Sequence, residues 1–150
     1  MTRDDDRDAV TKLIFRYAEL LDEGAFASAA HLFEHATSRA VVGSDVYTRT
    51  GADQVREQFD RMVITYDGIP ATKHVTTNVV VEVDDHARTA ACRSYYSVLQ
   101  ARPGLPLQVI IAGRYHDAFA NVDGEWRFTD RLIFSDLVGD LSHHLRTNPL

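Results

Sequence analysis

The sequence predicts an α+β fold in which three N-terminal helices pack on a strongly curved, mainly antiparallel sheet. Apolar side chains recur mainly at helical spacing in the first half of the chain, whereas residues 71–138 are typical of long strands joined by short turns. Short turns require neighbouring antiparallel strands, and runs longer than a usual strand require bends or bulges. A bent sheet packed on helices leaves a cone-shaped hollow between the layers, which is a natural ligand site.

The first two helices are predicted over residues 4–22 and 25–33. Asp4–Asp6 lie in the first turn of the first helix, where negative charge interacts favourably with the helix dipole. Gly24 provides a C-terminal stop between the two helices. The apolar stripe of the first helix is formed by Val10, Leu13, Ile14, Tyr17 and Leu21.

A short hairpin and a third helix are predicted next. Residues 37–50 contain Ala40–Val42 and Val46–Thr48 on either side of a Gly-Ser-Asp turn, which indicates strand, turn, strand. Thr50 can cap the third helix with Asp53 in a capping-box position, and Gly68 and Pro70 end it. The apolar face of this helix is formed by Val55, Phe59, Met62 and Val63.

Long strands make up most of the second half. The Asp123-Gly124 dipeptide between the last two strand-like runs is a strong hairpin signal. The predicted strands cover residues 71–84, 88–101, 107–121 and 125–138.

Length and charge limit the classes to which the protein can belong. The 150 residues suit one domain over residues 1–150. The net charge of −6, without a basic stripe, argues against nucleic acid and anionic membranes as partners. The single cysteine, Cys92, cannot form an internal disulfide, and the charged N-terminus lacks an apolar signal sequence. We therefore expect a cytoplasmic protein.

His74 opens the first long strand, and its orientation depends on whether that strand is regular. In a regular strand His74 lies on the face opposite Val75 and the alternate valines that follow. It would then point to solvent or to an interface. A bulge between Thr76 and Asn78 would instead turn His74 to the same side as the later valines. The polar Thr-Thr-Asn sequence tolerates such an interruption, so both arrangements stay open.

Five segments of the chain together resemble a known family. They are Tyr17–Phe26 at the end of the first helix, Lys73–Val75, Ala90–Tyr95, Gly113–Asp117 and Asp123–Arg127. This combination resembles the SnoaL-like branch of the nuclear transport factor 2-like superfamily, whose fold is a cystatin-like α+β cone. The Tyr-x4-Asp spacing with a strand histidine is similar to scytalone dehydratase and bile acid 7α-dehydratase. The resemblance covers nearly the whole chain and favours the bulge.

The resemblance implies an active site at the bottom of a cone-shaped pocket. His74 would be the general acid or base, and Asp22 would orient His74 or stabilise its positive charge. Tyr17 would hydrogen-bond the substrate. These dehydratases carry a further His or Asp on the second strand, and this chain has neither there. The predicted substrate contacts are Arg93, Tyr95, Ser97, Asn78 and Phe26.

The predicted function is that of a cofactor-free dehydratase or isomerase acting on a hydrophobic, cyclic, carbonyl-bearing molecule such as a steroid or polyketide. A histidine paired with a carboxylate can remove a proton beside a carbonyl and return it elsewhere. The alternative is a non-catalytic ligand-binding or assembly module. Because apolar residues occur on both faces of the long strands, we also expect a homo-oligomer, a dimer or trimer, formed through the outer sheet face.

The other histidines predict no metal site. His31 and His35 have i, i+4 spacing, but no further ligand pattern accompanies them. His143 and His144 near the C-terminus are expected at the surface.

Overall fold

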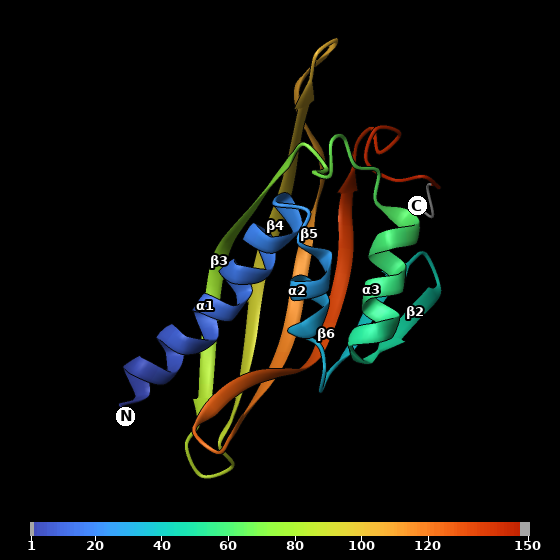
Figure 1. Cartoon of the computed structure of the whole chain (residues 1–150). Coiled ribbons are helices and arrows are strands. Elements are labelled where there is room, and N and C mark those ends of the chain that lie inside the picture. Colours follow the sequence, from blue (N-terminus) through green and yellow to red (C-terminus); the bar gives the residue numbers. More distant parts are fainter. Residues whose placement is uncertain (1, 148–150) are drawn as a thin grey trace.

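A computed structural model describes residues 2–147 and shows helices packed on one face of a six-stranded sheet (Figure 1). The predicted fold class, a cystatin-like α+β cone, is confirmed. Each predicted element is present, and most ends shift by up to two residues, but the third helix ends at Met62 and not at the predicted stop near Gly68. The elements are α1 (Arg3–Asp22), α2 (Phe26–His31), β1 (Thr37–Val42), β2 (Asp45–Thr50), α3 (Gly51–Met62), β3 (Thr72–Asp84), β4 (Thr89–Arg102), β5 (Leu105–Val122) and β6 (Glu125–Val138).

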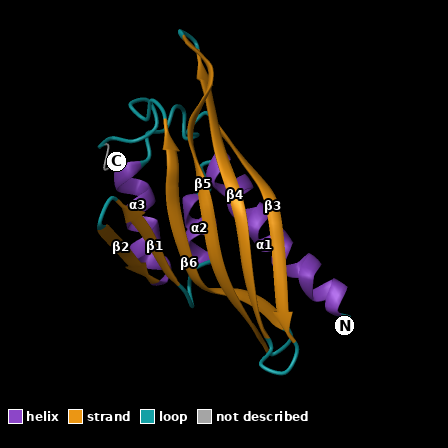
Figure 2. Ribbon diagram, turned by 180° about the vertical axis from the view of Figure 1, so that it is seen from behind, coloured by secondary structure: helices purple, strands orange, loops and turns teal. Residues whose placement is uncertain are grey.

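The strand order in the sheet is β2-β1-β6-β5-β4-β3. All neighbouring pairs are antiparallel except β1 and β6, which run parallel. Figure 2 shows the long strands from behind, twisting together across the helices, with the β4–β5 hairpin extending beyond the other strands. Register shifts interrupt the β3–β4, β4–β5 and β5–β6 ladders. These bulges allow strands of this length to bend around the helices.

The bulge in β3 determines which way His74 points. The β3–β4 register shifts between Thr77 and Val80, and Asn78 has a positive φ of 53°. Before the shift the half-buried positions are His74 and Thr76; after it they are the odd-numbered positions that begin at Val79. The predicted bulge is therefore confirmed, and it places His74 on the same face as the later valines.

A buried ion pair lies in the core between α1 and the sheet. Asp117 on β5 and Arg131 on β6 are directly opposite each other, and both side chains are 0% exposed. The guanidinium donates two hydrogen bonds to the carboxylate, at 2.8 and 2.9 Å. The rings of Tyr17 and Tyr115 lie over the guanidinium carbon at 4.4 and 3.8 Å. Two charges that are shielded from solvent are tolerated here because they form an ion pair joined by hydrogen bonds.

The start of α3 differs from the prediction. Thr50 is the N-cap residue, but its side chain makes no capping hydrogen bond. Its backbone N–H donates instead to the Gln54 side chain at 2.8 Å, so Asp53 does not complete a capping box. The acceptor is therefore Gln54, which lies one residue further into the helix than the predicted Asp53. Within residues 2–147, none of the helices has the length and apolar character needed to cross a bilayer.

Candidate active site

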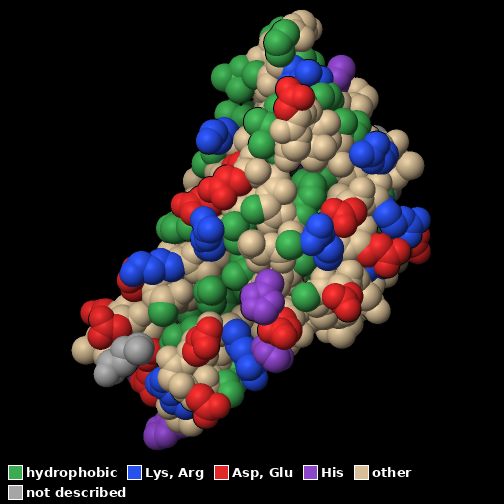
Figure 3. All heavy atoms as spheres, in the orientation of Figure 1, with side chains coloured by type: hydrophobic (Ala, Val, Ile, Leu, Met, Phe, Trp, Pro, Cys, Tyr) green, Lys and Arg blue, Asp and Glu red, His purple; other side chains and the backbone are tan. Residues whose placement is uncertain are grey.

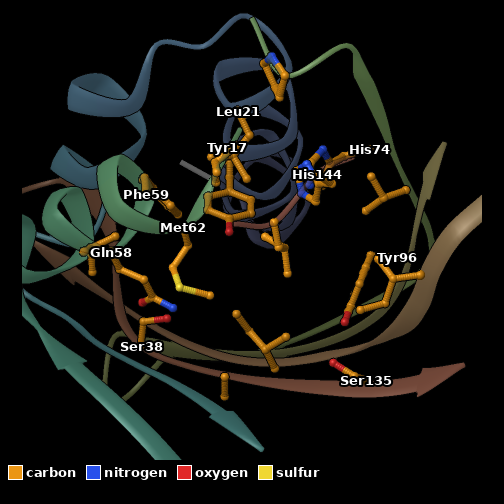
Figure 4. Close-up of a pocket in the computed structure, with 18 of the residues that line it drawn as sticks. Tyr17, Leu21, Ser38, Gln58, Phe59, Met62, His74, Tyr96, Ser135 and His144 are labelled. Atoms are coloured by element: carbon orange, nitrogen blue, oxygen red, sulfur yellow. The ribbon is translucent and has the colours of Figure 1, made fainter. Parts of the chain in front are cut away.

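A pocket of about 220 Å³ lies between the helices and the concave face of the sheet (Figure 4). Its walls come from all three helices, from all six strands and from the segment after β6. Apolar and aromatic side chains dominate the lining, and none of the described residues that line it is Asp, Glu, Lys or Arg. The titratable groups on its surface are histidines and tyrosines. Such a pocket favours an uncharged, hydrophobic ligand.

His74 and Asp22 form a hydrogen-bonded dyad at the edge of this pocket. The His74 Nδ1 and Asp22 Oδ1 atoms are 2.6 Å apart, and the two side chains are only 9% and 12% exposed. The His74 backbone N–H donates to Asp22 Oδ2 at 2.8 Å, and the Thr72 hydroxyl donates to Oδ1 at 2.9 Å. With the proton on Nδ1 directed to the carboxylate, Nε2 is left unprotonated and can act as a base.

The environment of Asp22 keeps its carboxylate ionised. Burial acts to raise its pKa, but the hydrogen bonds from the His74 ring and backbone and from Thr72 outweigh burial, so the net pKa is lowered. Asp22 is the last residue of α1, where the helix dipole disfavours a negative charge. The three donors therefore stabilise a carboxylate at a position that is locally unfavourable for one.

Tyr17 lies one turn and a half before Asp22 on α1, and its hydroxyl points into the pocket (Figure 4). Burial raises the pKa of this hydroxyl, with Arg131 acting in the opposite direction, so Tyr17 is a neutral hydroxyl at ordinary pH. The structure thus places His74 and Tyr17 in the wall of one pocket, with Asp22 hydrogen-bonded to His74 at its edge. Phe26, the predicted apolar contact, lines the same pocket.

The other predicted substrate contacts lie outside the pocket, and their placement is a correction. Arg93, Tyr95 and Ser97 point to the outer face of β4, where Tyr95 is 52% exposed. The buried positions of β4 are instead the even-numbered ones from Ala90 to Gln100. Asn78 is exposed at the bulge of β3. Because strand side chains alternate, choosing the wrong phase for β4 displaces every candidate on it.

His144 was expected at the surface, and the structure places it in the pocket wall instead. It lies near His74 in Figure 4, although it follows the last strand in sequence. Burial and the neighbouring His74 lower the pKa of His144 to about 4. No periodicity marks this segment, so the sequence carries no signal that would have brought the residue to the pocket.

Among residues 2–147, no group of three or more His, Cys, Asp or Glu side chains is arranged to hold a metal ion. His31 and His35 are exposed, and each has a ring nitrogen 3.7 Å from Glu34. Cys92 is buried, and burial raises the pKa of its thiol to about 11. It is therefore a packing residue rather than a nucleophile.

Sequence comparison identifies the family. A model of the SnoaL-like domain matches residues 3–132. The chain belongs to the SnoaL-like domain family. A comparison with curated proteins finds no match.

Solved structures share this SnoaL-like fold at low sequence identity. An NTF2-like protein with a cystatin-like fold from Novosphingobium aromaticivorans is 20% identical, with a TM-score of 0.71 over 88% of this chain and 82% of the other. A protein from the same bacterium, proposed to be a scytalone dehydratase, is 21% identical, with a TM-score of 0.67 over 90% and 87%. The β subunit of its proposed aromatic-ring-hydroxylating dioxygenase is 15% identical, with a TM-score of 0.72 over 89% and 90%. These similarities show the fold.

Proposed function

We propose that this SnoaL-like protein is a cofactor-free lyase or isomerase that acts on an uncharged, cyclic, carbonyl-bearing molecule. The observation that carries the proposal is the His74–Asp22 dyad at the edge of a pocket without charged lining. The neighbour described as a scytalone dehydratase supports the dehydratase form of this chemistry. Tyr17 is the proposed hydrogen-bond partner of the substrate.

The proposed reaction begins with a proton transfer. His74 Nε2 takes a proton from the carbon beside the substrate carbonyl, and the electron pair of the C–H bond moves to the carbonyl oxygen as an enolate. Asp22 stabilises the imidazolium that forms. If a hydroxyl group leaves from the next carbon with the returned proton, the reaction is a dehydration. If the proton returns to another carbon, the reaction is an isomerisation.

The size of the pocket limits the substrate. An apolar cavity of roughly 150 Å³ is large enough for benzene. A cavity of about 220 Å³ therefore suits one or two fused rings inside the pocket. Of the two classes that the sequence suggests, small polyketide-like bicyclic molecules fit this volume better than a fully enclosed four-ring steroid.

A bicyclic ketone tests the proton-transfer step without knowledge of the natural substrate. We expect the protein to catalyse exchange of the α-hydrogens of 2-tetralone with deuterated water, measured by proton NMR. His74→Gln keeps a polar side chain of similar size but no base, and should lower the exchange rate roughly 10²- to 10⁴-fold. His35→Gln, on an exposed histidine, is the control and should exchange like the wild type. Equal rates for wild type and His74→Gln would disprove the base.

A second candidate role is assembly through the outer sheet face. Val75, Tyr95 and Leu137 are apolar or aromatic, belong to three different strands and are 42%, 52% and 71% exposed. The structural neighbour described as the β subunit of a proposed ring-hydroxylating dioxygenase supports a role in assembly. On the helical face, acidic and basic side chains are interspersed (Figure 3), and the outer face carries the Arg93–Glu82 and Arg114–Asp136 pairs beside its apolar residues. We propose that a second copy of the chain covers the outer face.

Analytical ultracentrifugation checks the proposed oligomer. We expect a dimer or trimer at micromolar concentration. Leu137→Arg places a charge on the outer face, at the most exposed of these three residues, and should shift the protein toward monomer, whereas Lys12→Glu on the exposed side of α1 should not. A monomeric wild-type protein would contradict the proposal.

A further inference from the structure

His144 has a buried ring nitrogen that no described residue satisfies. Its Nδ1 atom is shielded from solvent and has no hydrogen-bond partner within residues 2–147. The ring lines the same pocket as His74 (Figure 4). Buried polar atoms are nearly always paired, and an orphaned one beside a pocket indicates that a ligand or water completes its hydrogen bonding.

The backbone around His144 is held firmly by segments far away in sequence. The His144 carbonyl accepts a hydrogen bond from the Ile64 backbone N–H at 2.8 Å. The preceding carbonyl, of His143, accepts from Gln100 Nε2 at 3.0 Å and from the Tyr66 hydroxyl at 2.7 Å. Gln100 is itself buried, at 1% exposure. A buried side chain that fixes a loop next to a pocket gives the loop the rigidity that a functional group requires.

The surroundings of His144 also fix its charge. Burial is the main cause of its low pKa of about 4, a positive charge on His74 adds to the effect, and Asp22 acts weakly in the opposite direction. At neutral pH the imidazole is therefore uncharged and carries one ring proton. A neutral imidazole of this kind is a poor base but a good hydrogen-bond donor toward a developing enolate.

Strand β4, which pairs with the strand that carries His74, supplies no such hydrogen-bond donor to this part of the pocket. On β4 the hydroxyl of Tyr96 donates to the Phe134 carbonyl at 2.9 Å. Val98, the other β4 residue that lines the pocket, is apolar. His144 comes from another part of the chain but reaches the pocket near the proposed base.

We propose that His144 is a second catalytic group of this pocket, which donates a hydrogen bond to the substrate oxygen that becomes negative when His74 removes a proton. The C–H bond breaks, its proton moves to His74 Nε2, and its electron pair becomes the enolate oxygen held by the His144 N–H. Return of the proton regenerates both histidines. This inference rests on the proposed function, because it assigns the oxygen-binding half of the same reaction.

The test compares 2-naphthol, a planar counterpart of the enol of 2-tetralone, with 2-tetralone itself. His144→Leu should weaken 2-naphthol binding roughly tenfold, measured by naphthol fluorescence, and leave 2-tetralone affinity almost unchanged. The maximal rate at which His144→Leu exchanges the α-hydrogens of 2-tetralone should fall on the order of 10²-fold. His144→Asn retains an N–H donor and should recover part of both losses. His143→Leu, on the adjacent exposed residue, is the matched control and should behave like the wild type.

The outcomes separate the two proposals. If the wild type exchanges 2-tetralone and His144→Leu does so equally well, the role of His144 is wrong and that of His74 stands. If the wild type does not exchange, the proposed function fails, and 2-naphthol binding alone decides whether His144 binds oxygen. Absence of saturable 2-naphthol binding by the wild type overturns the proposal as well.

A measurement on the wild-type protein does not depend on the activity of a variant. In protein labelled with nitrogen-15 at histidine, the His144 ring should stay neutral from pH 8 down to about pH 5 and shift when 2-naphthol binds. The His144 resonance is assigned as the signal that is absent from the spectrum of His144→Asn. A His144 ring that does not respond to 2-naphthol would contradict the contact.

Discussion

Replacement of Asp117 by alanine is expected to destabilise the protein by about 3–5 kcal/mol, because it leaves the Arg131 guanidinium buried without its counter-ion. Burial disfavours this charge, but Asp117 outweighs burial and raises the pKa of Arg131, so the side chain cannot escape the penalty by losing its proton. Urea denaturation followed by circular dichroism measures the loss in free energy of unfolding.

The same two strands provide a matched control. Arg114 on β5 and Asp136 on β6 form a similar two-bond pair at 2.8 and 3.0 Å, but their side chains are 38% and 40% exposed. Asp136→Ala should therefore cost less than about 1 kcal/mol, since water replaces the lost partner. Equal losses for the two variants would show that burial does not set the cost of breaking the Asp117–Arg131 pair.

Removal of the charge on Asp22 is expected to have the largest effect on activity after loss of His74 itself. Asp22→Asn keeps the shape of the side chain but no longer stabilises an imidazolium on His74, which is 2.6 Å away. We expect the exchange of 2-tetralone to slow roughly 10²- to 10⁴-fold, in line with the effect of such a change in other histidine–carboxylate pairs. Glu23→Gln, on the adjacent exposed residue whose carboxylate lies 4.0 Å from Arg16, is the control.

The stability of the same variant gives an independent measurement. The pKa of Asp22 is lower in the folded state than in an unfolded chain, so the folded state gains stability from its ionised form. This contribution is complete above the unfolded pKa of about 3.9 and is lost as the pH falls through the folded pKa. The stability difference between wild type and Asp22→Asn should therefore narrow below about pH 4. A difference that stays constant down to pH 2 would contradict the assignment.

Much of the fold follows from local patterns in the sequence. Helical spacing from Val10 to Leu21 places one apolar stripe on the sheet, and short turns such as Asp123-Gly124 join adjacent strands. The bulge near Asn78 was one of two open arrangements. The resemblance to the SnoaL-like family, which includes Lys73–Val75, favoured the bulge. The register between β3 and β4 shows this bulge. Three of the proposed site residues could therefore be named in advance.

Residues on β4 show where such reasoning fails. A strand that has both polar and apolar side chains on each face gives no clear phase, so Arg93, Tyr95 and Ser97 were assigned to the pocket instead of the outer face. A single step in phase exchanges the two faces completely. Burial of the even-numbered β4 side chains in the core decides the phase, and that burial is not a local property.

The sequence by itself determined which segments form helices and strands and their succession along the chain, and its resemblance to the family pointed to His74 and Asp22. Only the tertiary structure decided the position of His144 and the burial of the Asp117–Arg131 pair. Local patterns reflect backbone preferences and alternating burial within one element. The pocket, in contrast, brings together side chains from distant segments, and their neighbours exist only after the chain has packed.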